Sequence, residues 1–368
     1  MLGRPRTGQG QAALEAALTR LAEVFRNAGF TPVDTPHMFL GDTLLDVYGE
    51  DLRARAFLFP DAERDNELCL RPDFTVPVAL AHGAGGWDRM ANYSYAGPVF
   101  RRQPQGQGRP VEYVQAGVES LGVEDTVTAD ARIFALLHNG LEALGVTATH
   151  SQMGDLSIPF ALLDALDMPE RRRAGLHRHF WRPGRFQMLI DRACAPSEPS
   201  VTRAALLADP AGAAMVEVLG LRTSDDIHTR LADLAEEAAA TPMPRADADL
   251  INAVLAIQCP APDAPARLRA LTGAALVDPA IDRFEARLDA LAAEGMDPAQ
   301  LVFDAAFGRN LEYYDGFVFE TRAAGGGTHP PLAGGGRYDA LTVGLGADRP
   351  VPAIGGIIRP EPVLEVLK

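Results

Sequence analysis

The sequence has 368 residues, of which 47% are hydrophobic and 23% are charged, and its formal net charge is −15 at pH 7. This composition is typical of a soluble globular protein with one or two cores, and the negative charge disfavours a broad nucleic-acid-binding surface. Three widely spaced cysteines predict a reducing, cytoplasmic location, and neither a membrane span nor a signal peptide is expected because no long apolar run occurs.

Helical and extended segments alternate in the first 145 residues. A first helix is predicted by residues that recur at the helical period, Leu14, Leu18, Leu21 and Phe25. Gly29 is typical of a position just past a helix end, and the prolines of residues 29–36 favour an extended edge segment. Strands of an antiparallel sheet are predicted at residues 68–73, 93–102 and 111–122. A second helix is expected over residues 129–144.

The composition changes over residues 160–300, which are rich in alanine, leucine and charged residues and are interrupted by prolines. This pattern predicts helical hairpins, an accessory region inserted into one domain that spans residues 1–368. Strand character returns over residues 301–339, and the last residues predict a strand or turn followed by a short helix. The expected fold class is therefore α+β, not a regular βαβ repeat.

A polar face is predicted on the strand at residues 111–122. Side chains alternate in a strand, so Gln115, Gly117 and Glu119 share one face, and the opposite face is apolar and suits a core. A small ligand with a cationic or amide group fits such a floor, because glycine lets it approach the backbone. The alternative is an ordinary solvated sheet face.

Other candidate binding residues lie beside aromatic or glycine-rich segments. Arg101 precedes a Gly/Pro/Gln loop and is suited to bind a carboxylate or phosphate, unless it belongs to an ordinary polar hairpin. Arg309 is close to Tyr313 and Tyr314, a combination that can recognise an amino acid, although half-buried sheet tyrosines give the same pattern. The segment GGGRYD lacks the Lys-Ser/Thr of a P-loop and predicts a bulge or turn that presents Tyr338.

Residues 171–185 form a basic cluster in this acidic chain. The cluster is a candidate contact for a phosphate-bearing ligand or an acidic partner, or else a solvated helix face. Its two histidines, His177 and His179, are two residues apart and point in different directions on a helix. We therefore expect no metal site there, and no other Cys/His ligand set occurs in the sequence.

Taken together, several segments resemble class II aminoacyl-tRNA synthetases, in particular the histidyl-tRNA synthetase branch. They occur in the family's order and cover most of the chain outside its helical middle: GFTPVDTP (motif 1), LRPDFT, YAGPVFRR with GRPVEYVQAGVESLG (motif 2), GRNLEYYDGFVFE and GGGRYD. The resemblance implies an antiparallel sheet flanked by helices and a homodimer formed through motif 1. It also implies histidine-binding positions, which fall on Asp73, Gln115, Glu119, Arg309, Tyr313, Tyr314 and Tyr338, with Arg101 as an anion-binding residue.

The departures from the family pattern concern ATP. Motif 2 of a working synthetase has a glutamate and an arginine where this sequence has Gln103 and Pro104, and motif 3 ends in Glu-Arg where Ile357 and Ile358 precede Arg359. Each lost charge-assisted hydrogen bond weakens binding by about 1.5–3 kcal/mol. We therefore expect no catalytic residue, no cofactor and no tRNA. We also expect the family's anticodon-binding domain to be absent, because the motif 3 region lies next to Lys368.

This combination is similar to the regulatory-subunit family of ATP phosphoribosyltransferase, a histidyl-tRNA synthetase paralogue of histidine biosynthesis. The resemblance implies a non-catalytic protein that assembles with a short-form catalytic subunit into a hetero-octamer and supports both activity and feedback inhibition by histidine. Two alternatives remain open: a histidyl-tRNA synthetase-like enzyme that activates histidine with ATP, and an ATP-dependent amino-acid ligase on the same fold.

Overall fold

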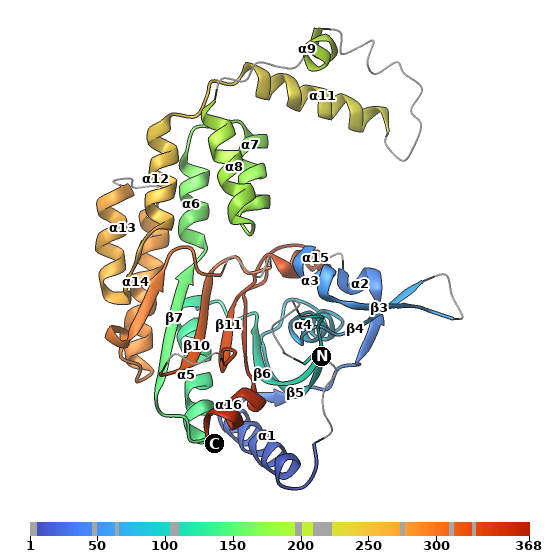
Figure 1. Ribbon diagram of the computed structural model, residues 1–368, viewed down its shortest axis with the longest axis vertical. Helices are drawn as coiled ribbons and strands as arrows, with labels where there is room; N and C mark the ends of the chain where they lie inside the picture. The colour runs from blue at the N-terminus through green and yellow to red at the C-terminus, as the bar shows by residue number, and fades with distance from the viewer. Residues whose placement is uncertain are drawn as a thin grey trace.

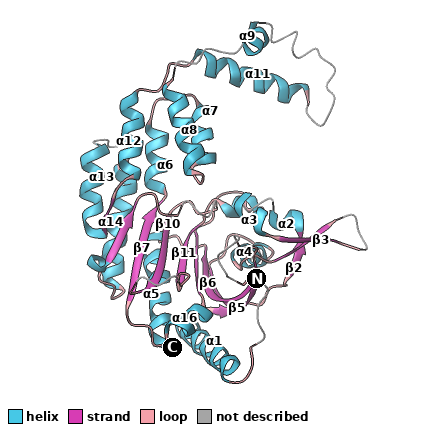
Figure 2. Cartoon of the chain, in the orientation of Figure 1, coloured by secondary structure: helices cyan, strands magenta, loops and turns pink. Residues whose placement is uncertain are grey.

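The computed structural model describes residues 6–45, 50–62, 66–103, 110–195, 201–208, 223–272, 277–308, 313–325 and 329–368. Within these ranges a nine-stranded sheet is the central element (Figure 2). Its strands run in the spatial order β1 (Thr31–Pro32), β5 (Ala91–Phe100), β6 (Glu112–Leu121), β12 (Ala353–Ile358), β11 (Ala333–Arg337), β10 (Phe317–Ala323), β7 (Thr149–Asp155), β9 (Leu301–Asp304) and β8 (Gln258–Pro260). Neighbouring strands are antiparallel except for β1 with β5 and β7 with β9.

A smaller sheet of three strands lies beside the first, in the order β2 (Met38–Leu40), β4 (Glu67–Leu70) and β3 (Phe57–Pro60). The predicted strand at residues 68–73 therefore forms, but in this second sheet and not beside its sequence neighbours in the large one. Helices α2 (Gly41–Leu45) and α3 (Glu50–Arg55) lie between β2 and β3, and α4 (Thr75–Gly83) leads from β4 to β5 of the large sheet. The buried helix α4 was not predicted, and its N-terminal end borders the candidate site described below.

Two long helices cover one face of the large sheet. Helix α1 (Gln9–Asn27) buries Leu14, Leu21 and Phe25 and is followed by Gly29, whose φ of 87° only glycine adopts readily. Helix α5 (Thr126–Ala143) begins at Asp125, whose side chain accepts a hydrogen bond from the backbone of Thr128. Both predicted helices are thus confirmed.

The remaining helices are α6 (Ser157–Ala165), α7 (Glu170–His179), α8 (Pro183–Cys194), α9 (Val201–Ala208), α11 (Ser224–Ala239), α12 (Arg245–Leu255), α13 (Ala264–Thr272), α14 (Asp278–Ala293), α15 (Leu341–Gly344) and α16 (Pro360–Val366). Helices α6 to α14 occupy the predicted helical region, although β8 lies within it and pairs with β9 of the large sheet. Helices α9 and α11 reach away from the sheet, at the top of Figure 1. The division into a core and an accessory region stays a prediction.

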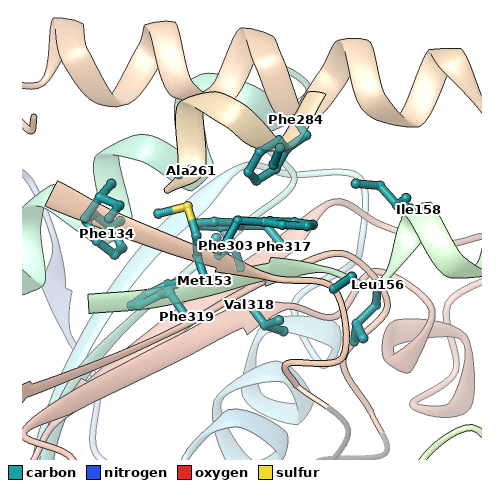
Figure 3. Close-up of a cluster of buried hydrophobic side chains, with 14 of the residues drawn as sticks. Phe134, Met153, Leu156, Ile158, Ala261, Phe284, Phe303, Phe317, Val318 and Phe319 are labelled. Atoms are coloured by element: carbon teal, nitrogen blue, oxygen red, sulfur yellow. The ribbon is translucent and has the colours of Figure 1, made fainter. Parts of the chain in front are cut away.

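The main hydrophobic core lies between the large sheet and its helices. Figure 3 shows its aromatic centre, where Phe284 of α14 packs on Phe303 of β9 with ring centroids 4.8 Å apart. Phe134 of α5 packs on Phe319 of β10 in an edge-on arrangement. Ala116 and Val118 of β6 belong to the same core, as the alternation in that strand predicts. The opposite face of β6 is therefore available for a site. Every helix in the described ranges is too short or too polar to cross a bilayer.

Candidate functional site

A cavity of about 130 Å³ lies against the face of the large sheet that the core helices leave uncovered. Strands β6, β11 and β12 form its floor, the start of α4 and the end of β5 contribute further walls, and residues just before β10 complete it. Five of the candidate residues line this cavity: Asp73, Arg101, Gln115, Tyr313 and Tyr314. Segments more than 200 residues apart in the sequence thus meet at one site, as the resemblance predicts.

Glycines of β11 and β12 make room for two side chains at or beside the cavity. A Cβ on Gly355 would lie 1.6 Å from Oε2 of Glu119, and a Cβ on Gly336 would lie 2.9 Å from the ring of Tyr314. Both distances are far below normal contact, so the carboxylate and the ring occupy space that any other residue would fill. The first four residues of the GGGRYD segment belong to strand β11 and do not form the predicted bulge or turn, whereas Tyr338 follows the strand and a turn begins at Asp339.

Glu119 is fully buried next to Gly355, and three hydroxyl groups donate to its carboxylate. The hydroxyls of Thr75 and Tyr95 each lie 2.9 Å from Oε1, and the hydroxyl of Tyr338 lies 2.5 Å from Oε2. Burial raises the pKa of Glu119 from the usual 4.5 to about 7, even though the three donors act to lower it. Glu119 and Tyr338 are not among the described residues that line the cavity. They lie beside the cavity, where Glu119 accepts a hydrogen bond from the lining residue Thr75.

The raised pKa of Glu119 predicts a pH-dependent stability. Between the unfolded value near 4.5 and the folded value of about 7, the native state holds a proton that the unfolded chain has released. The free energy of unfolding contributed by this group therefore falls as the pH rises through that window. Urea unfolding from pH 5 to pH 8 should show the wild-type protein losing stability relative to Glu119→Gln, whose amide does not titrate. Other titrating groups, such as His138, are common to both proteins, so parallel pH profiles would contradict the prediction.

Charged and amide side chains form the polar wall of the cavity. Nη2 of Arg101 lies 3.9 Å from Oδ2 of Asp73 and donates to the carbonyl oxygen of Pro72 at 3.0 Å. Gln115 is only 3% exposed, and its Oε1 has no hydrogen-bond partner among the described residues. A buried amide oxygen without a partner costs free energy unless a ligand or water donates to it. The wall is therefore suited to a small polar ligand that carries N–H donors.

The structure confirms some of the sequence predictions about the site residues and contradicts others. Gln115 and Glu119 are buried, so the alternative of a solvated sheet face is wrong. Tyr313 and Tyr314 precede β10 and are not strand residues, because the strand begins at Phe317. Arg309 lies outside the described residues. That the lining residues bind histidine stays a prediction.

Among the lining residues with polar side chains, three were not predicted as part of the site: Thr75, Glu320 and Arg359. Thr75 ends the family-like segment LRPDFT and begins α4, a helix without an amphipathic pattern, so the resemblance marked its segment but no periodicity pointed to its side chain. Arg359 could have been found from the alternation of β12, because Gly355, Ile357 and Arg359 are two residues apart and therefore share a face.

The basic cluster at residues 171–185 is largely held by partners within the chain. Arg172 pairs with Glu237 at 3.1 Å, Arg173 pairs with Glu170 at 2.6 Å, and Nε2 of His177 lies within hydrogen-bond distance of Oδ1 of Asp164, at 2.8 Å. These pairs connect α7 to α11 and α6. The described residues contain no group of three or more His, Cys, Asp or Glu side chains that could hold a metal ion.

Comparison with known proteins relates this architecture to two named groups. The family model for histidyl-tRNA synthetase matches residues 9–236 and 199–363. The ATP phosphoribosyltransferase regulatory subunit of Sinorhizobium medicae is 36% identical over 349 residues, which cover 88% of this chain and 89% of that protein.

Two solved structures share the fold. The crystal structure of an ATP phosphoribosyltransferase regulatory subunit/histidyl-tRNA synthetase from Bacillus halodurans has a TM-score of 0.73 at 22% identity, covering 100% of this chain and 82% of that one. The histidine–tRNA ligase subunit of Alicyclobacillus acidocaldarius has a TM-score of 0.60 at 25% identity, with coverage of 100% and 97%. The predicted class II synthetase-like fold is confirmed.

Proposed function

Because this chain belongs to the family of ATP phosphoribosyltransferase regulatory subunits, we propose that it regulates a separate catalytic chain and carries out no catalysis itself. The observation that carries this proposal is its 36% identity, across nearly nine-tenths of both chains, to a protein named for that role. The catalytic partner is a short-form ATP phosphoribosyltransferase, which joins ATP to phosphoribosyl pyrophosphate in histidine biosynthesis. The free thiols of Cys69, Cys194 and Cys259 support a reducing, cytoplasmic location for the complex.

Histidine is the effector, and the cavity is its binding site. Asp73 complements the ammonium of free histidine, and the two arginines of the cavity lining offer a cation for its carboxylate. The imidazole N–H suits the unpartnered oxygen of Gln115. The two adjacent tyrosines, Tyr313 and Tyr314, with ring centroids 4.7 Å apart, add aromatic surface for the ring. Glu119 and Tyr338, which share a hydrogen bond, lie beside this site.

Feedback requires that histidine bind the active and inhibited states of the complex with different affinity, since a ligand with equal affinity shifts no equilibrium. A homodimer core within a hetero-octamer provides the interfaces through which such a difference is transmitted. The exposed edge strand β1, which carries the motif 1-like residues Thr31 and Pro32, supports a dimer contact at this side of the sheet.

Reconstitution tests the proposal. Phosphoribosyl transfer by a short-form catalytic subunit should rise when the purified full-length chain is added, and histidine should then inhibit it. Asp73→Asn should leave the activation in place but raise the histidine concentration for half-inhibition about tenfold, because an ammonium–carboxylate contact is lost. Asp249→Asn, an exposed change on α12, is the matched control and should alter neither quantity. Failure of the two chains to form a complex would refute the regulatory role.

A second assay distinguishes the proposed regulatory role from the alternative of a histidine-activating enzyme. A histidine-activating enzyme exchanges pyrophosphate with ATP in the presence of histidine, whereas a regulatory subunit that has lost the ATP contacts of motifs 2 and 3 does not. We expect no histidine-dependent exchange above background. Robust exchange by the isolated chain would favour the synthetase-like enzyme.

A further inference from the structure

Arg359 lies on the cavity side of the sheet, at the end of β12. Ile357 pairs with Gly117 and Ile358 pairs with Ala116, so Arg359 follows in register next to Gln115. Its backbone N–H donates to the carbonyl oxygen of Leu332 at 2.8 Å, which extends the pairing with the chain before β11. Both Gln115 and Arg359 line the cavity.

The guanidinium of Arg359 is fixed in place before any ligand binds. Nη1 donates to the carbonyl oxygen of Pro331 at 3.0 Å, and the residue is only partly exposed. A planar group held by one hydrogen bond and by its backbone pairing loses little conformational entropy when it contacts an anion. Arg359 is therefore preorganised as an anion-binding group at the cavity wall.

The charges around the cavity suit a zwitterion better than a polyanion. The described lining residues include two cations, Arg101 and Arg359, and two anions, Asp73 and Glu320, so their formal charges cancel. The pKa of Arg359 is lowered, mainly by burial and further by the like charge of Arg101. The negative charge of Glu320 acts to raise this pKa. An anion bound at Arg359 would offset both the lost hydration and the repulsion.

We propose that Arg359 binds the α-carboxylate of the amino-acid ligand, while Asp73, before α4, binds its ammonium group. This inference rests on the proposed function of the cavity as a histidine site and deepens it. Arg359 is then a specificity-determining residue that distinguishes an amino acid from its decarboxylated amine.

Calorimetric titration of the full-length protein with L-histidine and with histamine, which lacks only the carboxylate, tests this role. The wild-type protein should bind histidine more tightly than histamine by a factor of about 10 to 100, the effect of one charge-assisted contact. Arg359→Gln should bind histidine more weakly than the wild-type protein by this same factor, and it should bind histamine with the wild-type affinity. Arg359→Lys, which keeps the positive charge, should retain part of the affinity for histidine that Arg359→Gln loses.

Controls separate this inference from the proposed function. Arg178→Gln, an exposed change on α7, should bind both compounds as the wild-type protein does. If Arg359→Gln keeps the wild-type ratio of the two affinities, or loses both equally while its urea midpoint stays unchanged, the carboxylate contact is refuted and the histidine site stands. If the wild-type protein binds no histidine, the contact and the site both fail, and the reconstitution assay still decides the regulatory role.

Discussion

Replacement of Arg287 by methionine should lower the free energy of unfolding by about 3–5 kcal/mol, because it removes the cation that pairs with the buried carboxylate of Asp155 and leaves buried Asp130 with Arg337 alone. Arg287 of α14 is 3% exposed; its Nε donates to Asp130 at 2.8 Å and its Nη1 donates to Asp155 at 2.7 Å. Its guanidinium also lies 4.7 Å from the ring centre of Phe317. Urea unfolding followed by circular dichroism measures the loss.

An arginine with the same number of carboxylate partners at the surface provides the control. Arg269 of α13 donates to Asp282 at 2.5 Å and to Glu285 at 2.8 Å, but all three side chains are well exposed. Solvent and salt screen such pairs, so Arg269→Met should change the urea midpoint far less. If both variants lost the same free energy of unfolding, burial would not be the reason for the strength of the Arg287 ion pairs.

Gly355→Ala should destabilise the protein by about 1–3 kcal/mol or more and weaken histidine binding at the same time. The added methyl group meets the Glu119 carboxylate at 1.6 Å, and that carboxylate cannot move without breaking its hydrogen bonds to Thr75, Tyr95 and Tyr338. Urea unfolding and calorimetric titration with histidine measure the two effects.

Gly175→Ala is the matched control for this substitution. Gly175 lies inside helix α7, and a Cβ there would have no atom within 4 Å. Alanine favours a helix over glycine by up to about 1 kcal/mol, so this variant should be as stable as the wild-type protein or more stable. A Gly355→Ala protein with wild-type stability and affinity would show that the floor can relax around an added side chain.

Strand periodicity correctly predicted the part of the site that lies on residues 111–122. The alternation in residues 111–122 placed Gln115 and Glu119 on one face and Ala116 and Val118 in the core, and the structure confirms both. Local pattern suffices there because a strand has a period of two whatever its neighbours are. The same rule applied to β12 would have placed Arg359 at the site.

Other features depend on contacts that no local pattern encodes. Helix α4 is a short apolar segment buried on most sides, and such a segment cannot be distinguished from a strand by its periodicity. The hydroxyl groups that surround Glu119 come from residues 24 to 219 positions away. Strand β7 has a mixed polar sequence, and it is recognised only through its partners β10 and β9.

The two outer strands of the large sheet limit how this protein can self-associate. Strand β1 has two residues and β8 has three, and each ends in a proline, Pro32 and Pro260, that has no N–H to donate. Edges this short offer little backbone for open-ended growth into fibrils, which long flat edges promote. The two outer strands of the large sheet therefore give the chain little means of polymerising through backbone pairing at these edges.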